Sequence, residues 1–544
     1  MSSRSTLATL TDSLTKVLPT WEPSEPLRAL TGWTGETLSF QVAWRPVPTD
    51  YAAPTTDVVL TVTGAEGIQL HAVDLVPIQV PCWEEHGDGF LTETPGMLPD
   101  VLRPLGPTSD GSVSLRATHI GWHSVWVDIE APIDAVHVTM TADGQQILDV
   151  TLPVHLVDRA LPEHGIENTQ WFHADCLATH YGVETWSEAH WDIIRGQMQA
   201  AAQMGVTMLL TPVWTPPLDT AVGTYRRTTQ LLEIGLADGT YSFGTKHLDR
   251  WLDTLAEAGI SRVEVPHLFT QWGAEWTPKF EVWENGQRTD RFGWDTPATD
   301  PEYQRFLSQL IPFLKSYFAE RVGLDKTVFH ISDEPNEHHL DSYRRARDSV
   351  QELLDGCRVL DALSHPEYAD LVQTPVVATD AVPSFRAVGT EPSWVYYCIA
   401  QSRDVSNRFI AQEAVRTRAL GWQLYKFRAV GFLHWALNFY SRQLSRGAIN
   451  PFAETSAGGG FISGDPFIVY PGPGGATWPS LRHRLMRDAF DDLAAARGAE
   501  EVLGRERVLS IIDPDGTLDY NAGWVSSEVW LGRRRQLDEA VARP

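Results

Sequence analysis

The stretch TVFHISDEP, residues 327–335, decides the fold of the middle of this chain. Its first five residues are mostly apolar and β-favouring, which predicts a strand buried on both faces, as in a parallel sheet. Pro335 cannot continue the hydrogen-bonded ladder, so Asp333 and Glu334 lie where the strand becomes a loop. Parallel α/β folds carry their chemistry at that end of a strand. Because two carboxylates are costly to bury without a purpose, we interpret them as a catalytic pair.

Strands and helices alternate on both sides of this stretch. Segments with the pattern of a buried strand are found at 168–175, 206–214, 261–269, 327–331, 357–364, 374–380, 393–401 and 431–440. Helices are predicted over 187–205, 245–259, 300–323, 338–356 and 407–431. This alternation favours a (β/α)8 barrel over a doubly wound sheet.

The two ends of the chain have other patterns. Between about residues 36 and 156, short segments that alternate apolar and polar residues are separated by turns, which predicts an antiparallel β-sandwich. Helices are predicted over 480–497 and 525–543. The expected fold is therefore α/β: an N-terminal antiparallel β-sandwich, a TIM-type barrel and C-terminal helices packed on the barrel. The expected domains are 1–160, 161–500 and 501–544.

Composition and charge restrict the class of protein. Hydrophobic residues make up 43% of the chain and charged residues 21%, which is typical of a globular protein. The formal charge of −27 argues against nucleic acid or a membrane surface as partner. The four cysteines show no CxxC spacing, which favours reduced thiols. Because the N-terminus lacks the apolar core of a signal peptide and no apolar run is long enough to span a membrane, a cytoplasmic protein is expected.

Aromatic and polar residues gather at the expected carboxyl ends of the barrel strands. A barrel places its active site there, and this mixture suits a sugar-binding cleft. The candidate substrate-binding residues are His173, Asp175, Trp214, His267, Gln271, Trp272, Tyr396, Tyr397, Trp435 and Asn438. Each also has a simpler interpretation: Trp214, Trp435 and Tyr397 as core residues, and Asp175 as a helix cap. Glu264, inside a strand, is interpreted as a barrel-interior or ion-paired residue.

Motifs for other chemistries are weak. His338 and His339 are adjacent and do not make an HExxH zinc site. His173, Asp175 and Asp333 are a possible ligand set for a divalent ion, but we expect neither a metal nor a cofactor. The sequence contains no Gly-x-Ser-x-Gly elbow and no legible Cys–His pairing.

Adjacent acids suit one particular division of labour. Ordinary glycosidases use two carboxylates that face each other across the scissile bond, which neighbouring residues on one strand end cannot easily do. In the alternative, the substrate's own 2-acetamido oxygen attacks the anomeric carbon. Asp333 would stay ionised and accept the acetamido N–H, while Glu334 would act as general acid and then base, its pKa raised by burial and by Asp333. The contrary interpretation is a structural acid pair.

Several of these segments resemble a known family. SDEP (332–335), HLFTQWGA (267–274), TPVWTPPLDT (211–220), GFLHWALNFY (431–440) and FISGDPFIVYPGPGG (461–475) are similar to bacterial proteins of glycoside hydrolase family 123. The resemblance covers most of the chain and is strongest at the strand ends. It implies a β-N-acetylgalactosaminidase that works by substrate assistance, with Asp333 orienting the acetamido group and Glu334 as acid/base.

Three hypotheses follow for the function. The first is an exo-acting β-N-acetylhexosaminidase whose partner is an oligosaccharide or glycoconjugate. The second is a glycosidase of neutral sugars that combines Glu334 with another carboxylate, such as Asp361 or Asp175. The third is a non-catalytic carbohydrate-binding protein.

Overall fold

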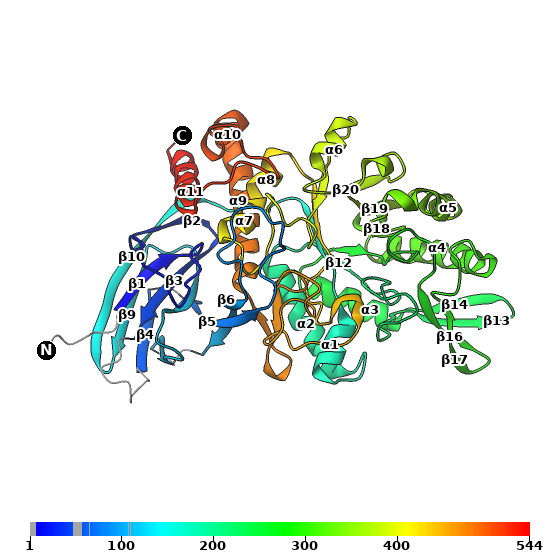
Figure 1. Ribbon diagram of the computed structural model, residues 1–544, viewed down its shortest axis with the longest axis horizontal. Coiled ribbons are helices and arrows are strands. Elements are labelled where there is room, and N and C mark those ends of the chain that lie inside the picture. Colours follow the sequence, from blue (N-terminus) through cyan, green and yellow to red (C-terminus); the bar gives the residue numbers. More distant parts are fainter. Residues whose placement is uncertain (1–6, 47–56, 65, 107, 109, 544) are drawn as a thin grey trace.

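The computed structural model describes residues 7–46, 57–64, 66–106, 108 and 110–543. Residues 1–6, which open the predicted sandwich domain, lie outside this description. Figure 1 shows the sandwich at one end of the molecule and the barrel at the other, with the C-terminal helices above their junction. The predicted fold class is confirmed.

The N-terminal sandwich consists of two five-stranded sheets. One has the order β1 (Leu7–Asp12), β3 (Thr37–Arg45), β8 (His123–Glu130), β5 (Gln69–Ile78) and β6 (Gly96–Leu105). The other has the order β2 (Leu30–Thr34), β10 (Gln145–Ala160), β9 (Ala135–Ala142), β4 (Asp57–Thr63) and β7 (Ser112–Arg116). Alternate residues of β4 and β9 are buried, as expected for strands with one face on a core. The pair β2–β10 is parallel, so the sandwich is antiparallel with that exception.

The barrel is closed by parallel strands in sequence order. They are β11 (Glu167–Gln170), β12 (Met208–Leu210), β15 (Arg262–Glu264), β18 (Thr327–Phe329), β19 (Arg358–Leu363), β20 (Thr374–Ala378), β21 (Trp394–Tyr396) and β22 (Gly431–His434). Each lies within a predicted strand segment or begins one residue before it. β22 pairs with both β21 and β11, which closes the ring. In the stretch 327–335, the β-ladder ends at Phe329, earlier than predicted. Residues 330–334 therefore form a loop after β18.

Four of the predicted connecting helices are confirmed: α2 (Glu188–Gln203), α3 (Lys246–Glu257), α4 (Pro301–Arg321) and α5 (Leu340–Val350). Their caps follow from sequence, since the Ser187 side chain accepts the His190 N–H and Asp300 accepts the Glu302 and Tyr303 N–H groups. Two short helices also occur, α1 (Ala174–Tyr181) and α6 (Val382–Ala387).

The single helix predicted over 407–431 is wrong. The structure has α7 (Ala414–Arg418) and α8 (Leu420–Lys426), and residues 407–413 are irregular. The Arg408 side chain is buried and donates hydrogen bonds to Gln170 Oε1 and to the Ala436 carbonyl. These long-range bonds override the local helical pattern.

Two β-structures were not predicted. A four-stranded sheet with the order β14 (Thr240–Gly244), β13 (Glu233–Ala237), β16 (Lys279–Glu284) and β17 (Gln287–Phe292) is inserted between barrel elements, and Figure 1 shows it at the end farthest from the sandwich. A two-stranded ribbon joins β23 (Val469–Pro471) and β24 (Thr477–Pro479).

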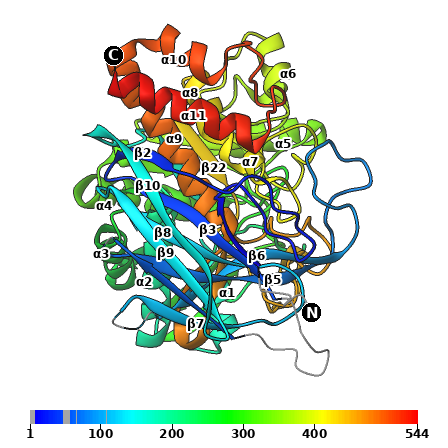
Figure 2. The ribbon, with the colours of Figure 1, turned by 90° about the vertical axis from the view of Figure 1, so that its left-hand side faces the viewer.

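The C-terminal helices are α9 (Leu481–Leu503), α10 (Arg505–Ile512) and α11 (Ser527–Ala542). Figure 2 shows α11 running along β2 and β10, so it contacts the sandwich as well as α7 and α9 of the barrel side. The chain continues from β10 to β11 within a few residues. The division into domains at 1–160, 161–500 and 501–544 stays a prediction.

A buried ion cluster joins these parts. The Arg534 guanidinium lies 2.7 Å from Glu36 of the sandwich, 2.6 Å from Asp492 of α9 and 3.1 Å from Asp538 of α11. All four side chains are buried. The cation is therefore the shared partner of three carboxylates.

Replacing Arg534 with alanine is expected to destabilise the fold by about 3–5 kcal/mol, because Glu36 and Asp538 lose their cation and Asp492 keeps only Arg418. Urea unfolding measures the change. Arg535→Ala, at the exposed neighbouring position, is the matched control and should stay within about 0.5 kcal/mol of the original. Equal stability of the two variants would contradict the role assigned to the cluster.

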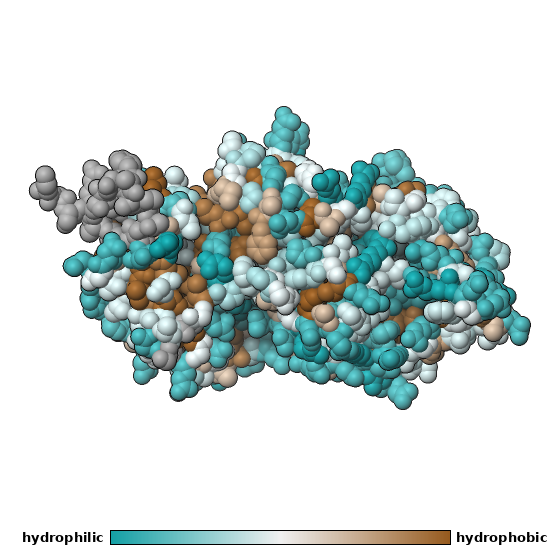
Figure 3. All heavy atoms as spheres, turned by 90° about the horizontal axis from the view of Figure 1, so that it is seen from below, coloured by the Kyte–Doolittle hydropathy of each residue, from teal (hydrophilic) through white to brown (hydrophobic). Residues whose placement is uncertain are grey.

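The face of the molecule seen from below is mostly hydrophilic (Figure 3). Seen from below, apolar residues form separate patches among hydrophilic ones (Figure 3). Large exposed apolar side chains such as Ile120 and Val222 are far apart in sequence.

Among the residues that the structure describes, no helix has both the length and the apolar composition needed to cross a bilayer. Cys82, Cys176, Cys357 and Cys398 are all free, as the spacing predicted.

Candidate active site

A pocket of about 580 Å³, including the solvent at its open mouth, lies at the carboxyl ends of the barrel strands. It is lined by Trp171, Leu218, Asp219, Gln271, Trp272, Asp333, Glu334, Ala362, Tyr396, Cys398, Ile399, Leu433, Trp435 and Phe461. The walls are mostly aromatic and aliphatic, and three carboxylates provide the charged groups. This combination suits a ligand with apolar faces and polar edges, such as a sugar ring.

A strained turn holds the two adjacent acids. Glu334 has a φ of 40°, in the left-handed region, and is followed by Pro335. Such a backbone costs about 1–3 kcal/mol and persists where surrounding contacts fix it. The Trp272 N–H donates to the Asp333 carbonyl at 2.9 Å, and the Ser332 hydroxyl donates to the Thr270 carbonyl at 2.8 Å. The loop after β15 therefore fixes the turn after β18.

The Glu334 carboxylate is held from the side of β21. The Tyr396 hydroxyl donates to Glu334 Oε1 at 2.5 Å, and Cys398 Sγ lies 3.9 Å from the same oxygen. Burial raises the pKa of Glu334 above its usual range, and the charge of Asp380 adds to this, against the hydrogen bond from Tyr396. Glu334 is thus both oriented and disposed to hold a proton.

The Asp333 carboxylate has a different environment. Among the residues that the structure describes, no group donates a hydrogen bond to it, although it faces the pocket. Burial raises the pKa of Asp333 well above its ordinary value, and the neighbouring Glu334 charge raises it further. Ionisation of both acids at once is therefore disfavoured in the free pocket, and the raised pKa of Asp333 differs from the ionised Asp333 that the sequence led us to expect.

The other carboxylates considered from the sequence do not reach the pocket. Asp361 is fully buried and accepts the Ile331 N–H at 2.9 Å and the Tyr343 hydroxyl at 2.5 Å. Asp175 is buried against Arg226, whose guanidinium contacts both carboxylate oxygens at 2.8 and 2.5 Å. Neither is placed to attack a sugar or to activate a water on it. The glycosidase hypothesis built on Asp361 or Asp175 therefore loses its second carboxylate.

The pocket brings together half of the residues singled out from the sequence: Asp333, Glu334, Gln271, Trp272, Tyr396 and Trp435. Trp272 is 44% exposed at the mouth. The Trp435 indole N–H donates to Asp465 at 2.9 Å, which fixes the ring that lines the pocket. These residues come from the ends of β15, β18, β21 and β22, as expected for a barrel site.

The other candidate binding residues lie outside the pocket lining. Trp214 is fully buried, with its indole N–H 3.2 Å from the His267 carbonyl. Tyr397 points away from the pocket because successive side chains of a strand face opposite sides, and its hydroxyl contacts Met486. Asn438 accepts the His173 N–H at 2.8 Å. His267, His173 and Asp175 are likewise buried among protein groups and support the site from behind.

The sequence missed several lining residues. Asp219 follows β12 at a φ of 40°, and its carboxylate accepts the Leu444 N–H at 2.8 Å. Phe461 comes from the loop after β22. Asp219 is part of TPPLDT, a segment rich in turn-forming residues at a strand end, and that signal was available. Phe461 has no such local signal, because it is far from any barrel strand in the sequence. The long loop after β22 places it at the mouth of the barrel.

The fold and this pocket define the class of protein, a barrel-type glycoside hydrolase. Residues 171–498 match the family model described as "Glycoside hydrolase 123, catalytic domain". The chain therefore belongs to glycoside hydrolase family 123, as its motifs indicated. It is an enzyme that acts on glycans or glycoconjugates, so the hypothesis of a non-catalytic carbohydrate-binding protein is dropped.

A solved structure of similar fold supports the architecture, with a TM-score above 0.5. A family 123 glycoside hydrolase from Clostridium perfringens, studied for glycolipid glycan hydrolysis, is 15% identical, with 99% of each chain covered and a TM-score of 0.72. A Clostridium thermocellum xylanase 10B is 8% identical, with 90% of this chain and 94% of that chain covered and a TM-score of 0.31. A Bacteroides ovatus GH5 xyloglucanase is 9% identical, with 86% and 99% covered and a TM-score of 0.31. No curated protein matches the chain.

Proposed function

We propose that this glycoside hydrolase is an exo-acting β-N-acetylhexosaminidase that retains anomeric configuration by substrate assistance, with β-N-acetylgalactosaminides preferred. The observation that carries the proposal is the adjacent pair Asp333–Glu334 in a pocket that neither Asp361 nor Asp175 reaches. Neighbouring acids on one turn do not flank a glycosidic bond, so a nucleophile from the substrate fits better. The glycolipid glycans of the Clostridium perfringens relative are the substrate class that we carry over.

The first half of the reaction forms an oxazolinium ion. The acetamido carbonyl oxygen attacks the anomeric carbon while the bond to the leaving oxygen breaks and Glu334 gives that oxygen its proton. Asp333 accepts the acetamido N–H and stabilises the positive charge that develops on the ring. Among the described residues no group donates a hydrogen bond to the Asp333 carboxylate in the free pocket, and this N–H would provide one.

Substrate binding also determines which of the two acids, Asp333 or Glu334, holds the proton. A hydrogen bond from the acetamido N–H stabilises ionised Asp333, so the proton that the two acids share moves to Glu334. In the second half, Glu334 takes a proton from water, whose oxygen attacks the anomeric carbon and reopens the ring. Glu334 is then protonated again, and the cycle closes.

A substrate panel tests the proposal. Aryl β-glycosides of N-acetylgalactosamine, N-acetylglucosamine and galactose differ in the 2-acetamido group and in the 4-hydroxyl. We expect the acetamido substrates to have a kcat/KM at least about 10³-fold higher, because an internal nucleophile has a high effective molarity. Preference for the galactoside would overturn substrate assistance.

One observation favours a second candidate function. Asp219 lines the same pocket, and burial raises its pKa to about 6. It replaces Asp361 and Asp175 as the carboxylate that could partner Glu334 in a conventional glycosidase of neutral sugars. In the leading proposal, Asp219 instead accepts a hydroxyl of the bound sugar.

Asp219→Asn separates the two candidates. The leading proposal predicts a loss of about 10- to 100-fold in kcat/KM, mostly through KM, because one hydrogen bond to a charged group is weakened. A conventional glycosidase would lose nearly all turnover and regain it with azide as external nucleophile. Kinetics with and without azide on the same substrate measure the difference.

A further inference from the structure

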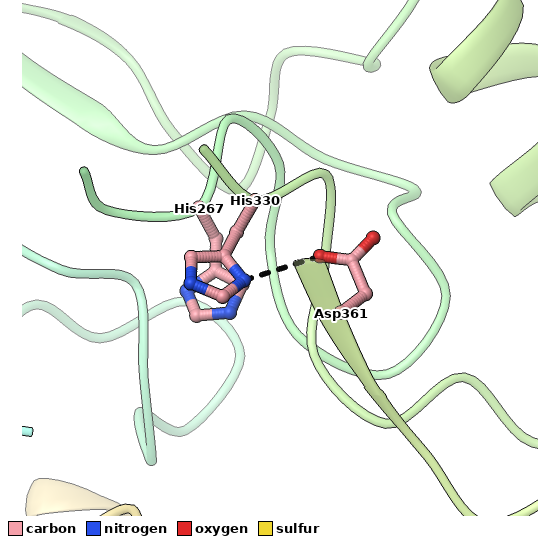
Figure 4. A group of neighbouring side chains, drawn as sticks. All are labelled: His267, His330 and Asp361. Atoms are coloured by element: carbon pink, nitrogen blue, oxygen red, sulfur yellow. Dashed lines mark ion pairs between the residues drawn. The ribbon is translucent and has the colours of Figure 1, made fainter. Parts of the chain in front are cut away.

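A buried histidine lies behind the acid pair, between two carboxylates. His330 Nε2 is 2.7 Å from Glu264 Oε1 of β15, and its Nδ1 is 3.4 Å from Asp361 Oδ1 of β19. All three side chains are buried, with exposed fractions of 1% or less. Figure 4 shows the contact of His330 with Asp361. The imidazole therefore meets a carboxylate at each ring nitrogen.

Both carboxylates are held as hydrogen-bond acceptors. Glu264 Oε1 accepts the Trp171 indole N–H at 2.8 Å, and its other oxygen accepts the Thr169 hydroxyl. Asp361 accepts the Ile331 N–H and the Tyr343 hydroxyl. Each carboxylate is thus held by two donors besides His330. Burial raises the pKa of Asp361, and the contacts with His330, Tyr343 and Ile331 act against this effect.

The charge of His330 follows from these contacts. Burial by itself lowers the pKa of His330, but the contacts with the Asp361 and Glu264 carboxylates and their charges raise it to about 10. His330 Nε2 is hydrogen-bonded to Glu264, whereas Nδ1 forms an ion pair with Asp361 at 3.4 Å and has no hydrogen-bond partner among the described residues. His330 is therefore a cation at neutral pH.

The ligand atoms of His267, His330 and Asp361 lie within 4.8 Å of one another, but the two imidazole rings are not oriented toward one metal ion. His267 stacks on His330 with ring centroids 4.5 Å apart and an interplanar angle of 28° (Figure 4). Imidazole lone pairs lie in the ring plane, so stacked rings do not direct them to one ion. Burial and the charge of His330 lower the pKa of His267 well below its ordinary value, so it is a neutral ring packed on a charged one.

This cation is close to the reacting acids. His330 is three residues before Asp333 on the same strand end, and its charge lowers the pKa of Asp333 against the effects of burial, Glu334, Asp361 and Glu264. Tyr396, Cys398 and Asp380 are further titratable groups near the pair. Trp171, anchored on Glu264, links the same network to the pocket lining.

We propose that His330 is a positioning residue whose fixed positive charge, held by Glu264 and Asp361, limits the Asp333–Glu334 pair to one shared proton at neutral pH. The proposal rests on the proposed function. Without the cation, both acids would be protonated in the buried pocket. Asp333 could then neither stabilise the oxazolinium charge nor accept the acetamido N–H as an anion.

The test is the pH profile of kcat/KM for His330→Gln on an aryl β-N-acetylhexosaminide. Removing a positive charge disfavours ionisation of nearby acids, so both limbs of the bell should move to higher pH, by about one to two units. His267→Gln is the matched control, since it removes an equally buried but neutral ring and should not move the limbs. A His330→Gln profile that only loses height, with unmoved limbs, would overturn the proposal.

A second measurement uses the unmodified protein and does not depend on activity or on the variant folding. With ¹⁵N-labelled histidine, surface imidazoles are neutral at about pH 8.5, whereas one imidazolium signal should remain. Absence of that signal would overturn the proposal. Failure of the substrate panel with the signal present would instead remove the proposed function and leave the buried cation standing.

Discussion

Glu334→Gln is expected to lower kcat/KM by about 10²–10⁴-fold on substrates with sugar leaving groups, because these need a proton as the bond breaks. Aryl glycosides with strongly acidic leaving groups should lose far less. Burial raises the pKa of Glu334, which favours the protonated acid, and we expect its deprotonation to end activity on the alkaline side. The alkaline limb of the pH profile should therefore disappear in the variant.

The activated substrate is the internal control of this experiment, because the same variant protein is measured on both substrates. A series of aryl leaving groups of decreasing pKa gives the dependence directly. Equal losses along the whole series would mean that Glu334 does not donate the proton. Tyr396→Phe provides a milder companion, since it removes the hydroxyl that orients Glu334 while the acid stays in place.

Asp333→Asn should lower kcat by about 10²–10³-fold on acetamido substrates, because the amide cannot supply the negative charge that stabilises the oxazolinium ion. In contrast to Glu334→Gln, the loss should be similar for good and poor leaving groups while ring formation limits the rate. Steady-state kinetics on the same aryl series measures this.

Binding of a thiazoline, a stable mimic of the bicyclic intermediate, gives an independent measurement. Its affinity should fall with Asp333→Asn by a factor comparable to the loss in kcat, since both report stabilisation of the same ring. Asp219→Asn, in the same pocket, is the matched control and should weaken the mimic and the simple sugar product equally. Unchanged thiazoline affinity in Asp333→Asn would contradict the orienting role.

The pattern of apolar and polar residues in the sequence was sufficient to predict the fold class. A run of β-favouring apolar residues marks each barrel strand, although the strand before the acids ends at Phe329 and not at Pro335. These signals are local, because burial on both faces of a parallel strand dictates residue type directly. The irregular segment 407–413 was missed because Arg408 is held by partners from β11 and from the loop after β22, which no local pattern reveals.

The same distinction applies to the pocket. The sequence by itself determined that Asp333 and Glu334 lie in the loop after a strand, because a β-favouring run precedes them and Pro335 follows them. The tertiary structure alone decided which strand-end residues line the pocket, since alternation sends Tyr396 inward and Tyr397 outward from neighbouring positions. It also decided the charge behind the pair, because Glu264, His330 and Asp361 meet only when three strands are laid side by side. Contacts between distant segments set electrostatics, and a linear pattern does not contain them.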